Sequence, residues 1–114
     1  MMKEDCIFCK IGAKQIPADP IYEDEEFFAF RDLNPQAPVH VLLIPKEHHD
    51  TMLDVADVSM LGRAFAAVRE TARRLDLQDS GFRTVVNTRD DGGQTVYHLH
   101  FHILGGRFMG WPPG

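Results

Sequence analysis

One run of alternating residues, at positions 97–105, constrains the fold of this chain most; it reads Tyr-His-Leu-His-Phe-His-Ile-Leu-Gly. Successive side chains of a β-strand point to opposite faces, so His98, His100 and His102 share one face. The apolar residues between them share the other, which predicts a half-buried strand on a core. Residues two apart on a strand are roughly 6.6 Å apart, so two of the three imidazoles at most could share one zinc ion. We therefore expect the three histidines to have different roles.

The order of the other elements predicts an α+β fold. Short strands are expected at residues 21–23, 26–31, 39–44 and 82–87, a short helix at 7–13, and loops at 32–38, 89–95 and 105–114. A long amphipathic helix is predicted at 57–75 from the apolar stripe Val58, Leu61, Phe65, Val68, Ala72 and Leu75. Because consecutive strands with short turns pair antiparallel, we expect one antiparallel sheet of about five strands. The long helix should cover its apolar face, opposite the histidines.

Length and charge limit the class of protein. With 114 residues the chain is expected to form one domain, residues 1–114. A net charge of -5 argues against a partner that is a nucleic-acid polymer or a membrane surface, although a small phosphorylated ligand needs only a local pocket. No apolar run approaches the roughly 20 residues that a bilayer requires, and the first residues lack the apolar core of a signal peptide. We expect a cytoplasmic protein.

The residues around the histidines favour phosphate chemistry. A neutral imidazole is a nucleophile and, with a small pKa shift, a proton donor. The sequence Gly-Gly-Gln-Thr at 92–95 comes just before the imidazoles. Its glycines would let backbone N–H groups approach phosphate oxygens, and Gln94 and Thr95 would add side-chain donors. A Gly-Gly pair alone more often marks an ordinary turn, so its weight comes from this position.

Residues 93–107 resemble the signature of the histidine triad (HIT) superfamily, in which three histidines alternate with apolar residues. Other segments are similar to the Hint branch of nucleoside phosphoramidases: Cys-Ile-Phe-Cys-Lys-Ile at 6–11, Ala-Phe-Arg-Asp at 29–32, Pro-Gln-Ala-Pro-Val-His at 35–40, Ile-Pro-Lys at 44–46 and Trp-Pro-Pro-Gly at 111–114. The resemblance implies a HIT-like fold and a homodimer whose two sheets join into one. It also implies hydrolysis of purine nucleoside 5′-phosphoramidates, such as adenosine 5′-monophosphoramidate, to AMP or GMP and an amine.

The same resemblance implies roles for single residues. His100 matches the nucleophile that becomes transiently nucleotidylated, with His98 in support, while His102 and His40 match histidines on the phosphate side. Thr95 stands where this branch often has serine, and it keeps the hydroxyl. The matched substrate-binding positions are Asp32 for the ribose, Asn87, Gly93, Gln94 and Thr95 for the phosphate and leaving group, and Phe8, Ile11, Phe30 and Leu33 for the base. Each of the last four could equally be a core residue.

The tail at 105–114 has two interpretations. In the resembled family this tail crosses toward the partner's active site, where Trp111 would shape the choice of leaving group. A lone aromatic residue near a C-terminus otherwise packs most often on its own domain.

The only two cysteines, Cys6 and Cys9, form a C-x-x-C pair, which in a reducing compartment indicates metal or redox chemistry more than a structural disulfide. Together with His48 and His98 they are similar to the zinc site of some superfamily members, including the galactose-1-phosphate uridylyltransferase branch. Several Hint-like proteins lack these cysteines and need no metal. Zinc here would therefore be structural, with no cofactor required for catalysis, and the alternative is two free buried thiols.

Three other functions compete with a phosphoramidase. The first is a nucleotide-binding regulatory module whose activity is incidental, which the intact histidine row and Thr95 disfavour. The second is a zinc-stabilised protein-interaction domain. The third is a dinucleoside polyphosphate hydrolase, as in a neighbouring branch, which the Trp-Pro-Pro-Gly ending disfavours.

Overall fold

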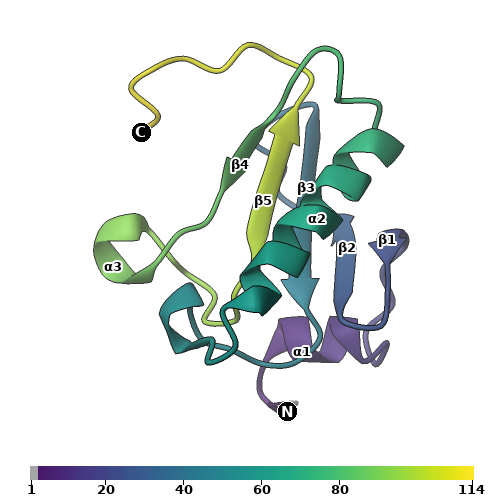
Figure 1. The fold of residues 1–114 in the computed structure, drawn as a ribbon, viewed down its shortest axis with the longest axis vertical. Coiled ribbons are helices and arrows are strands. Elements are labelled where there is room, and N and C mark those ends of the chain that lie inside the picture. The colour runs from purple at the N-terminus through teal and green to yellow at the C-terminus, as the bar shows by residue number, and fades with distance from the viewer. Residues whose placement is uncertain (1–2) are drawn as a thin grey trace.

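The fold is built on one antiparallel sheet, seen here in a computed structural model that describes residues 3–114. Its strands are β1 (Pro20–Glu23), β2 (Phe27–Arg31), β3 (Val39–Pro45), β4 (Arg83–Val85) and β5 (Phe101–Gly105). They lie in the order β1-β2-β3-β5-β4 and every neighbouring pair is antiparallel (Figure 1). The first three strands form a meander through short turns, and β5 lies between β3 and the short edge strand β4. The predicted α+β fold with a single antiparallel sheet is confirmed.

The long helix α2 (Ser59–Arg74) lies across one face of this sheet (Figure 1). Its buried residues are Met60, Ala64, Ala67, Val68, Thr71 and Ala72, which pack with Phe27, Ala29, Val41, Leu43, Leu99, Phe101 and Ile103. The predicted stripe was partly wrong, since Val58 and Phe65 are exposed. Small alanine side chains face the sheet instead, because they allow the helix backbone to approach the strands closely. Phe65 stays at the margin of the core, in an edge-to-face contact with Phe101.

The short helix α1 (Ile7–Gly12) covers part of the opposite face. A second apolar cluster forms there from Cys6, Phe8, Cys9, Ile11, Phe28, Phe30, Leu42 and Ile44. The alternation of β2 explains both clusters, because Phe27 and Ala29 point toward α2 while Phe28 and Phe30 point toward α1. Helix α1 and this cluster therefore shield part of the face that carries the histidines from water.

The predicted histidine strand was too long. Strand β5 begins only at Phe101, and residues 97–100 form an irregular segment before it. Edge strand β4 pairs with residues 102–104 alone, and the backbone N–H of Leu99 donates instead to the carbonyl oxygen of His49, at 2.7 Å. Only His102 is on the strand, where it points away from the α2 side that buries Phe101 and Ile103. The assignment of opposite faces is confirmed for this part of the run.

Two short helices occupy regions without a predicted helix. The 3-10 helix η1 (Met52–Asp54) is closed by a capping box between Thr51 and Asp54. Helix α3 (Arg89–Gly92) lies in the predicted glycine loop and ends at Gly93, whose φ of 78° is the left-handed conformation that glycine adopts without strain.

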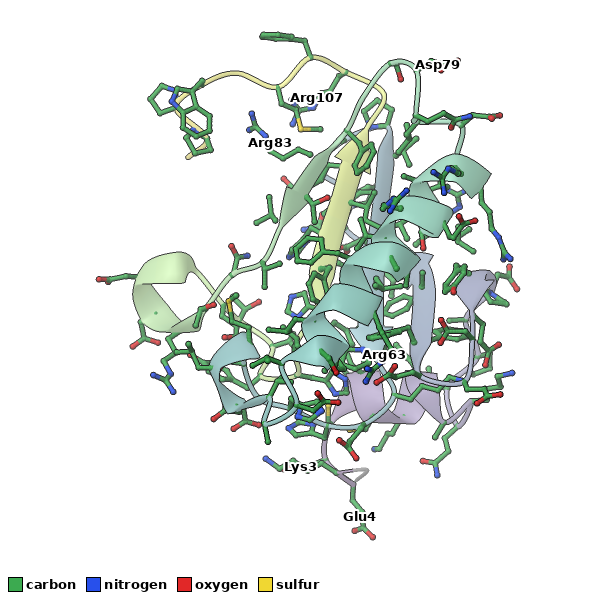
Figure 2. All side chains as sticks on the ribbon, viewed as in Figure 1. Lys3, Glu4, Arg63, Asp79, Arg83 and Arg107 are labelled. Atoms are coloured by element: carbon green, nitrogen blue, oxygen red, sulfur yellow. The ribbon has the colours of Figure 1, made fainter. Side chains whose placement is uncertain are left out.

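The C-terminal tail, residues 106–114, has no regular structure and extends away from the end of β5 (Figure 1). A guanidinium N–H of Arg83 donates to the carbonyl oxygen of Gly110, at 2.8 Å, and Figure 2 shows Arg83 and Arg107 beside this tail. Phe108 and Trp111 are 91% and 83% exposed in the single chain. Within residues 3–114, no helix has the length and apolar character needed to span a membrane.

Candidate active site

His100 is held as a neutral imidazole with one free nitrogen. Its Nδ1 lies 2.7 Å from the backbone carbonyl oxygen of His98. A carbonyl oxygen only accepts hydrogen bonds, so Nδ1 carries the proton and Nε2 keeps its lone pair. The ring is 7% exposed, and this burial lowers the pKa of His100. A neutral ring with a fixed tautomer and a directed lone pair is what a histidine nucleophile requires.

A chain of hydrogen bonds fixes the other tautomer on His102, with the proton on Nε2. The backbone N–H of Gln36 donates to Nδ1 of His40, at 3.0 Å. Nδ1 of His40 is therefore an acceptor, and in the neutral ring the proton is on Nε2, which lies 2.9 Å from Nδ1 of His102. His102 accepts that bond, which leaves its own proton on Nε2. The relay thus begins at a backbone amide and ends at an N–H group.

The N–H at the end of this relay has no partner. Within residues 3–114, Nε2 of His102 is the one buried side-chain nitrogen or oxygen atom without a hydrogen bond. Burial, with a smaller effect of His100 and His40, lowers the pKa of His102 to about 4. The ring is neutral near pH 7, and its unpaired N–H costs about 1–3 kcal/mol unless a ligand accepts from it. An oxyanion beside His102 would remove that cost.

The lone pair of His100 and the N–H of His102 belong to adjacent rings, whose centroids are 5.0 Å apart. Asp32 lies at the rim of this pair, with Oδ2 3.4 Å from Nε2 of His40 and Oδ1 accepting from the amide of Asn34. Its carboxylate is partly exposed, so it remains open to a ligand. A nucleophile, a hydrogen-bond donor and a carboxylate therefore meet in one place.

The apolar residues expected at the base position have different surroundings. Phe8, Ile11 and Phe30 are buried in the second cluster, and the Phe8 ring makes edge-to-face contacts with Phe30, His98 and His100. Leu33 is 98% exposed. In the single chain, Leu33 therefore does not line the same apolar surface as the other three.

The predicted phosphate-side residues are also separated by their contacts. The amide nitrogen of Gln94 donates to the carbonyl oxygens of Asp50 and Val96, at 2.7 and 3.1 Å, and its oxygen accepts from the amide of Arg89. Gln94 therefore ties the loop before the histidines to the loop that carries His48. Thr95 is exposed and Asn87 is partly exposed, while Gly93 ends α3.

Cys6, Cys9, His48 and His98 converge beside the histidine pair. One ligand atom from each lies within 4.8 Å of all the others. Nδ1 of His98 is 3.3 and 3.4 Å from the two sulfur atoms, and Nδ1 of His48 is 3.2 Å from Cys9. Both cysteines are buried and form no disulfide. Burial raises the pKa of the Cys9 thiol.

The outer hydrogen bonds of this cluster suit a metal. Nε2 of His98 donates to the carbonyl oxygen of Pro45 at 2.7 Å, and Nε2 of His48 donates to the carboxylate of Asp50 at 2.6 Å. Both rings consequently turn an unprotonated Nδ1 toward the sulfurs, as zinc ligands do. Two thiolates and two imidazoles form a tetrahedral zinc donor set, so the residues fit this metal.

A second set, Asp32, His40 and His102, also has its ligand atoms within 4.8 Å of one another. His40 differs here from the two histidines of the cysteine cluster. The backbone amide of Gln36 donates to Nδ1 of His40, so the proton is on Nε2, the nitrogen that faces Asp32 and His102. A protonated nitrogen has no lone pair for a metal. This set is better described as a hydrogen-bond relay.

Sequence reasoning missed the groups that orient these rings. They are the carboxylate of Asp50, the carbonyl oxygen of Pro45 and the backbone amide of Gln36. Backbone groups leave no mark in a sequence. Asp50, two residues from His48, could have been proposed as the carboxylate partner of a metal-binding histidine.

Comparisons with known proteins agree with this fold. Residues 13–109 match the HIT domain. The chain is 50% identical over 115 residues to an uncharacterized HIT-like protein of Synechococcus elongatus, covering 99% of this chain and 100% of that protein. It is 47% identical over 114 residues to a 14 kDa zinc-binding protein of Brassica juncea, covering 96% and 100%. The crystal structure of a HIT family hydrolase from Legionella pneumophila has a TM-score of 0.91 at 46% identity, covering 96% and 100% of the two chains.

A single antiparallel sheet, with alternating histidines at the start of strand β5, thus defines a histidine triad fold. The chain belongs to the HIT family, as its resemblance to that superfamily predicted.

Proposed function

We propose that this protein is a nucleoside phosphoramidase that hydrolyses purine nucleoside 5′-phosphoramidates through a nucleotidylated His100. The observation that carries the proposal is the pairing of two fixed tautomers: a free Nε2 lone pair on the buried residue His100 beside a buried, unpartnered Nε2–H on His102. The first can attack phosphorus and the second can donate to a phosphate oxygen. The resemblance of the flanking segments to the Hint branch supplies the substrate class.

The reaction has two displacements at the α-phosphorus. In the first, the lone pair of His100 forms a P–N bond while the bond from phosphorus to the amine breaks and the leaving nitrogen takes up a proton from solvent. His102 donates to a non-bridging oxygen, where negative charge is stabilised during the transfer. In the second, water attacks phosphorus and gives up a proton to solvent, the bond to His100 breaks with its electron pair returning to Nε2, and the nucleoside monophosphate leaves. The carbonyl oxygen of His98 holds Nδ1 of His100 throughout.

The other proposed contacts place the nucleotide around this pair. Asp32 accepts from the ribose hydroxyls, since a carboxylate suits two hydroxyls on adjacent carbons. Phe8, Ile11 and Phe30 bound the base, and Thr95 with the backbone of Gly93 serves the leaving group. Asn87 completes the phosphate side. These residues leave the choice between AMP and GMP products open, so both nucleotides belong in any assay.

We also propose a homodimer. Strand β4 is one of the two edge strands of the sheet, and its outer side is available for pairing with a second copy. Leu33, Phe108 and Trp111 are large apolar side chains that the single chain leaves exposed, and a partner could bury them. In such a dimer the tail at 105–114, with Trp111, would reach the active site of the partner. Analytical ultracentrifugation of the wild type and of Trp111→Ala tests this point.

Zinc bound to Cys6, Cys9, His48 and His98 would cross-link α1, the loop after β3 and the segment before β5. It supplies structural stability and takes no part in the chemistry. The name of the Brassica juncea relative supports this assignment, as do the tautomers of both histidines. Reduced thiols are also consistent with a protein of the cytoplasm, where we propose that it acts.

Turnover on three substrate types tests the proposed function. We expect release of AMP from adenosine 5′-monophosphoramidate with a kcat/KM at least tenfold above that on diadenosine polyphosphates or sugar nucleotides. A higher value on a diadenosine polyphosphate would favour a dinucleoside polyphosphate hydrolase. Nucleotide binding without turnover of any of them would favour the regulatory module.

A further inference from the structure

The metal cluster and the nucleophile share one residue, His98. Its ring turns Nδ1 toward the sulfurs of Cys6 and Cys9, at 3.3 and 3.4 Å. Its backbone carbonyl oxygen accepts the bond that fixes the tautomer of His100, at 2.7 Å. Any displacement of the His98 ring that reaches its backbone therefore moves the acceptor on which His100 depends.

A second contact runs through α1. Phe8 lies between the two cysteines in sequence, and its ring makes edge contacts with His98 and His100, at centroid distances of 5.9 and 5.2 Å. Cys6 is also the N-cap of this helix, since its sulfur accepts from the amide of Cys9. The position of the cysteines thus determines the position of an aromatic ring against the nucleophile.

A third contact runs through the loop after β3. His48 faces Cys9 and donates to Asp50, whose backbone carbonyl accepts from Gln94 in the segment before the triad. In the same loop, the carbonyl oxygen of His49 accepts from the amide of Leu99, between His98 and His100. Three stretches of chain therefore meet at the cluster: one of them holds His100 itself, and the other two, α1 and the loop after β3, both contact it.

Without a metal, these stretches are held together at the cluster by thiol–imidazole contacts. A thiol is a weak hydrogen-bond donor, whereas bonds from zinc to two sulfurs and two nitrogens fix all four side chains together. A bound nucleotide would need the same arrangement, because His100 and Phe8 must be in place to contact it.

We propose that the Cys6–Cys9–His48–His98 cluster is a positioning device for His100, so that zinc binding and nucleotide binding strengthen each other. This inference rests on the proposed function, since it takes His100 as the residue that meets the nucleotide. Thermodynamic linkage requires the coupling to be reciprocal: the factor by which zinc tightens AMP binding equals the factor by which AMP tightens zinc binding. Couplings of this kind are typically about 5- to 150-fold.

Two titrations on the full chain test the coupling. In the first, AMP is titrated by calorimetry into zinc-loaded protein and into protein stripped with a chelator. In the second, a chromophoric chelator competes for zinc with and without saturating AMP, which requires only the folded, loaded protein. We expect at least about a fivefold tightening in each direction, with the two factors equal within error.

A matched pair of variants assigns the effect to the cluster. His48→Ala removes one ligand, and we expect it to lose most of its zinc affinity and the zinc dependence of AMP binding. His49→Ala is the control, because this neighbouring histidine turns its ring toward Glu47 and not toward the sulfurs. It should keep both affinities and their coupling.

The outcomes separate this inference from the function on which it rests. Equal AMP affinity within twofold for loaded and stripped protein, with zinc affinity unchanged by AMP, overturns the coupling while leaving a phosphoramidase intact. Failure to bind zinc overturns it as well. If neither form binds AMP or turns over the phosphoramidate, the proposed function fails, and the inference fails with it.

Discussion

Nε2 of His40 lies 2.9 Å from Nδ1 of His102, and the amide of Gln36 on the far side of the His40 ring decides which atom carries the proton. The direction of one backbone amide is thus transmitted through two rings to the buried Nε2–H of His102. His40 acts in this arrangement as a positioning residue for His102. Its own contact with the phosphate, expected from the resemblance, stays a prediction.

Removal of the His40 ring tests the relay. In His40→Leu, Nδ1 of His102 loses its donor, so the ring can place its proton on either nitrogen. We expect kcat/KM for the phosphoramidate to fall about 10²-fold. The ¹⁵N spectrum of His102 should change from the Nε2–H tautomer to a mixture, a change that general loss of packing does not produce. A His40→Leu protein with wild-type kcat/KM and tautomer would refute the relay, and His49→Leu serves as the control.

The stability of the protein should decrease in mild acid because of His102. Its pKa is about 4 in the folded protein against an ordinary value of 6.5. Between these values the unfolded chain binds a proton that the folded chain does not, so the free energy of unfolding falls as the pH is lowered. From pH 6.5 to pH 5 this group lowers the free energy of unfolding by about 1.5 kcal/mol.

Urea unfolding of wild type and His102→Gln at pH 7, 6 and 5 measures that contribution. Other groups titrate in both proteins, so the difference between the two curves reports on His102. We expect the wild type to lose stability relative to the variant as the pH falls. Parallel curves would contradict a neutral, buried His102.

Gln94 should matter for stability. Its side chain makes three hydrogen bonds that join α3, the loop at Asp50 and the segment at Val96. Gln94→Ala leaves these backbone groups without partners and should lower the free energy of unfolding by at least about 2 kcal/mol. Gln36→Ala is the matched control, because its exposed side chain makes a single bond to the carbonyl of Asn34 and should cost less than about 0.5 kcal/mol. Similar losses in the two variants would argue against this role.

Two glycine substitutions should have opposite effects. Gly62 lies in α2 with no atom within 4 Å of an added Cβ, so Gly62→Ala should stabilise the protein by about 0.5–1 kcal/mol. At Gly105, at the end of β5, an added Cβ would lie 2.6 Å from Cδ2 of the buried Leu77, so Gly105→Ala should destabilise by about 1–3 kcal/mol. Thermal unfolding gives both signs, and stabilisation by Gly105→Ala would contradict the packing of Leu77 against this strand.

The strands, their antiparallel pairing and the long helix could be predicted from the sequence. Apolar residues recur every second position in a half-buried strand and every three or four positions in a half-buried helix. The start of β5 could not be predicted. A strand continues only where the backbone of a neighbour pairs with it, and here the backbone N–H of Leu99 donates to His49 while the carbonyl oxygen of His98 accepts from the ring of His100. The rotation of α2 was also missed, because apolar counting favoured Phe65 over the small alanines that a close helix–sheet contact requires.

The site was predictable as a set of residue types and not as a geometry. Spacing predicted that the histidines would have different roles, and the structure places His98 beside the cysteines and His102 beside His40. The tautomers could not be foreseen, since the backbone groups of Gln36, Pro45 and His98 set them. Gln94 shows the same limit of the sequence. Its side-chain amide could bind a phosphate, but in the structure it donates to backbone carbonyl oxygens.

The central claim is that Nε2 of His100 forms a covalent bond to phosphorus. Rapid acid-free quenching of wild type with adenosine 5′-monophosphoramidate, followed by intact mass and peptide mapping, tests it directly. The account predicts a transient adduct of one adenylyl group on His100 that disappears as AMP is released, and no adduct or turnover in His100→Ala. An adduct on another residue, or AMP release by His100→Ala at a rate near that of wild type, would contradict it.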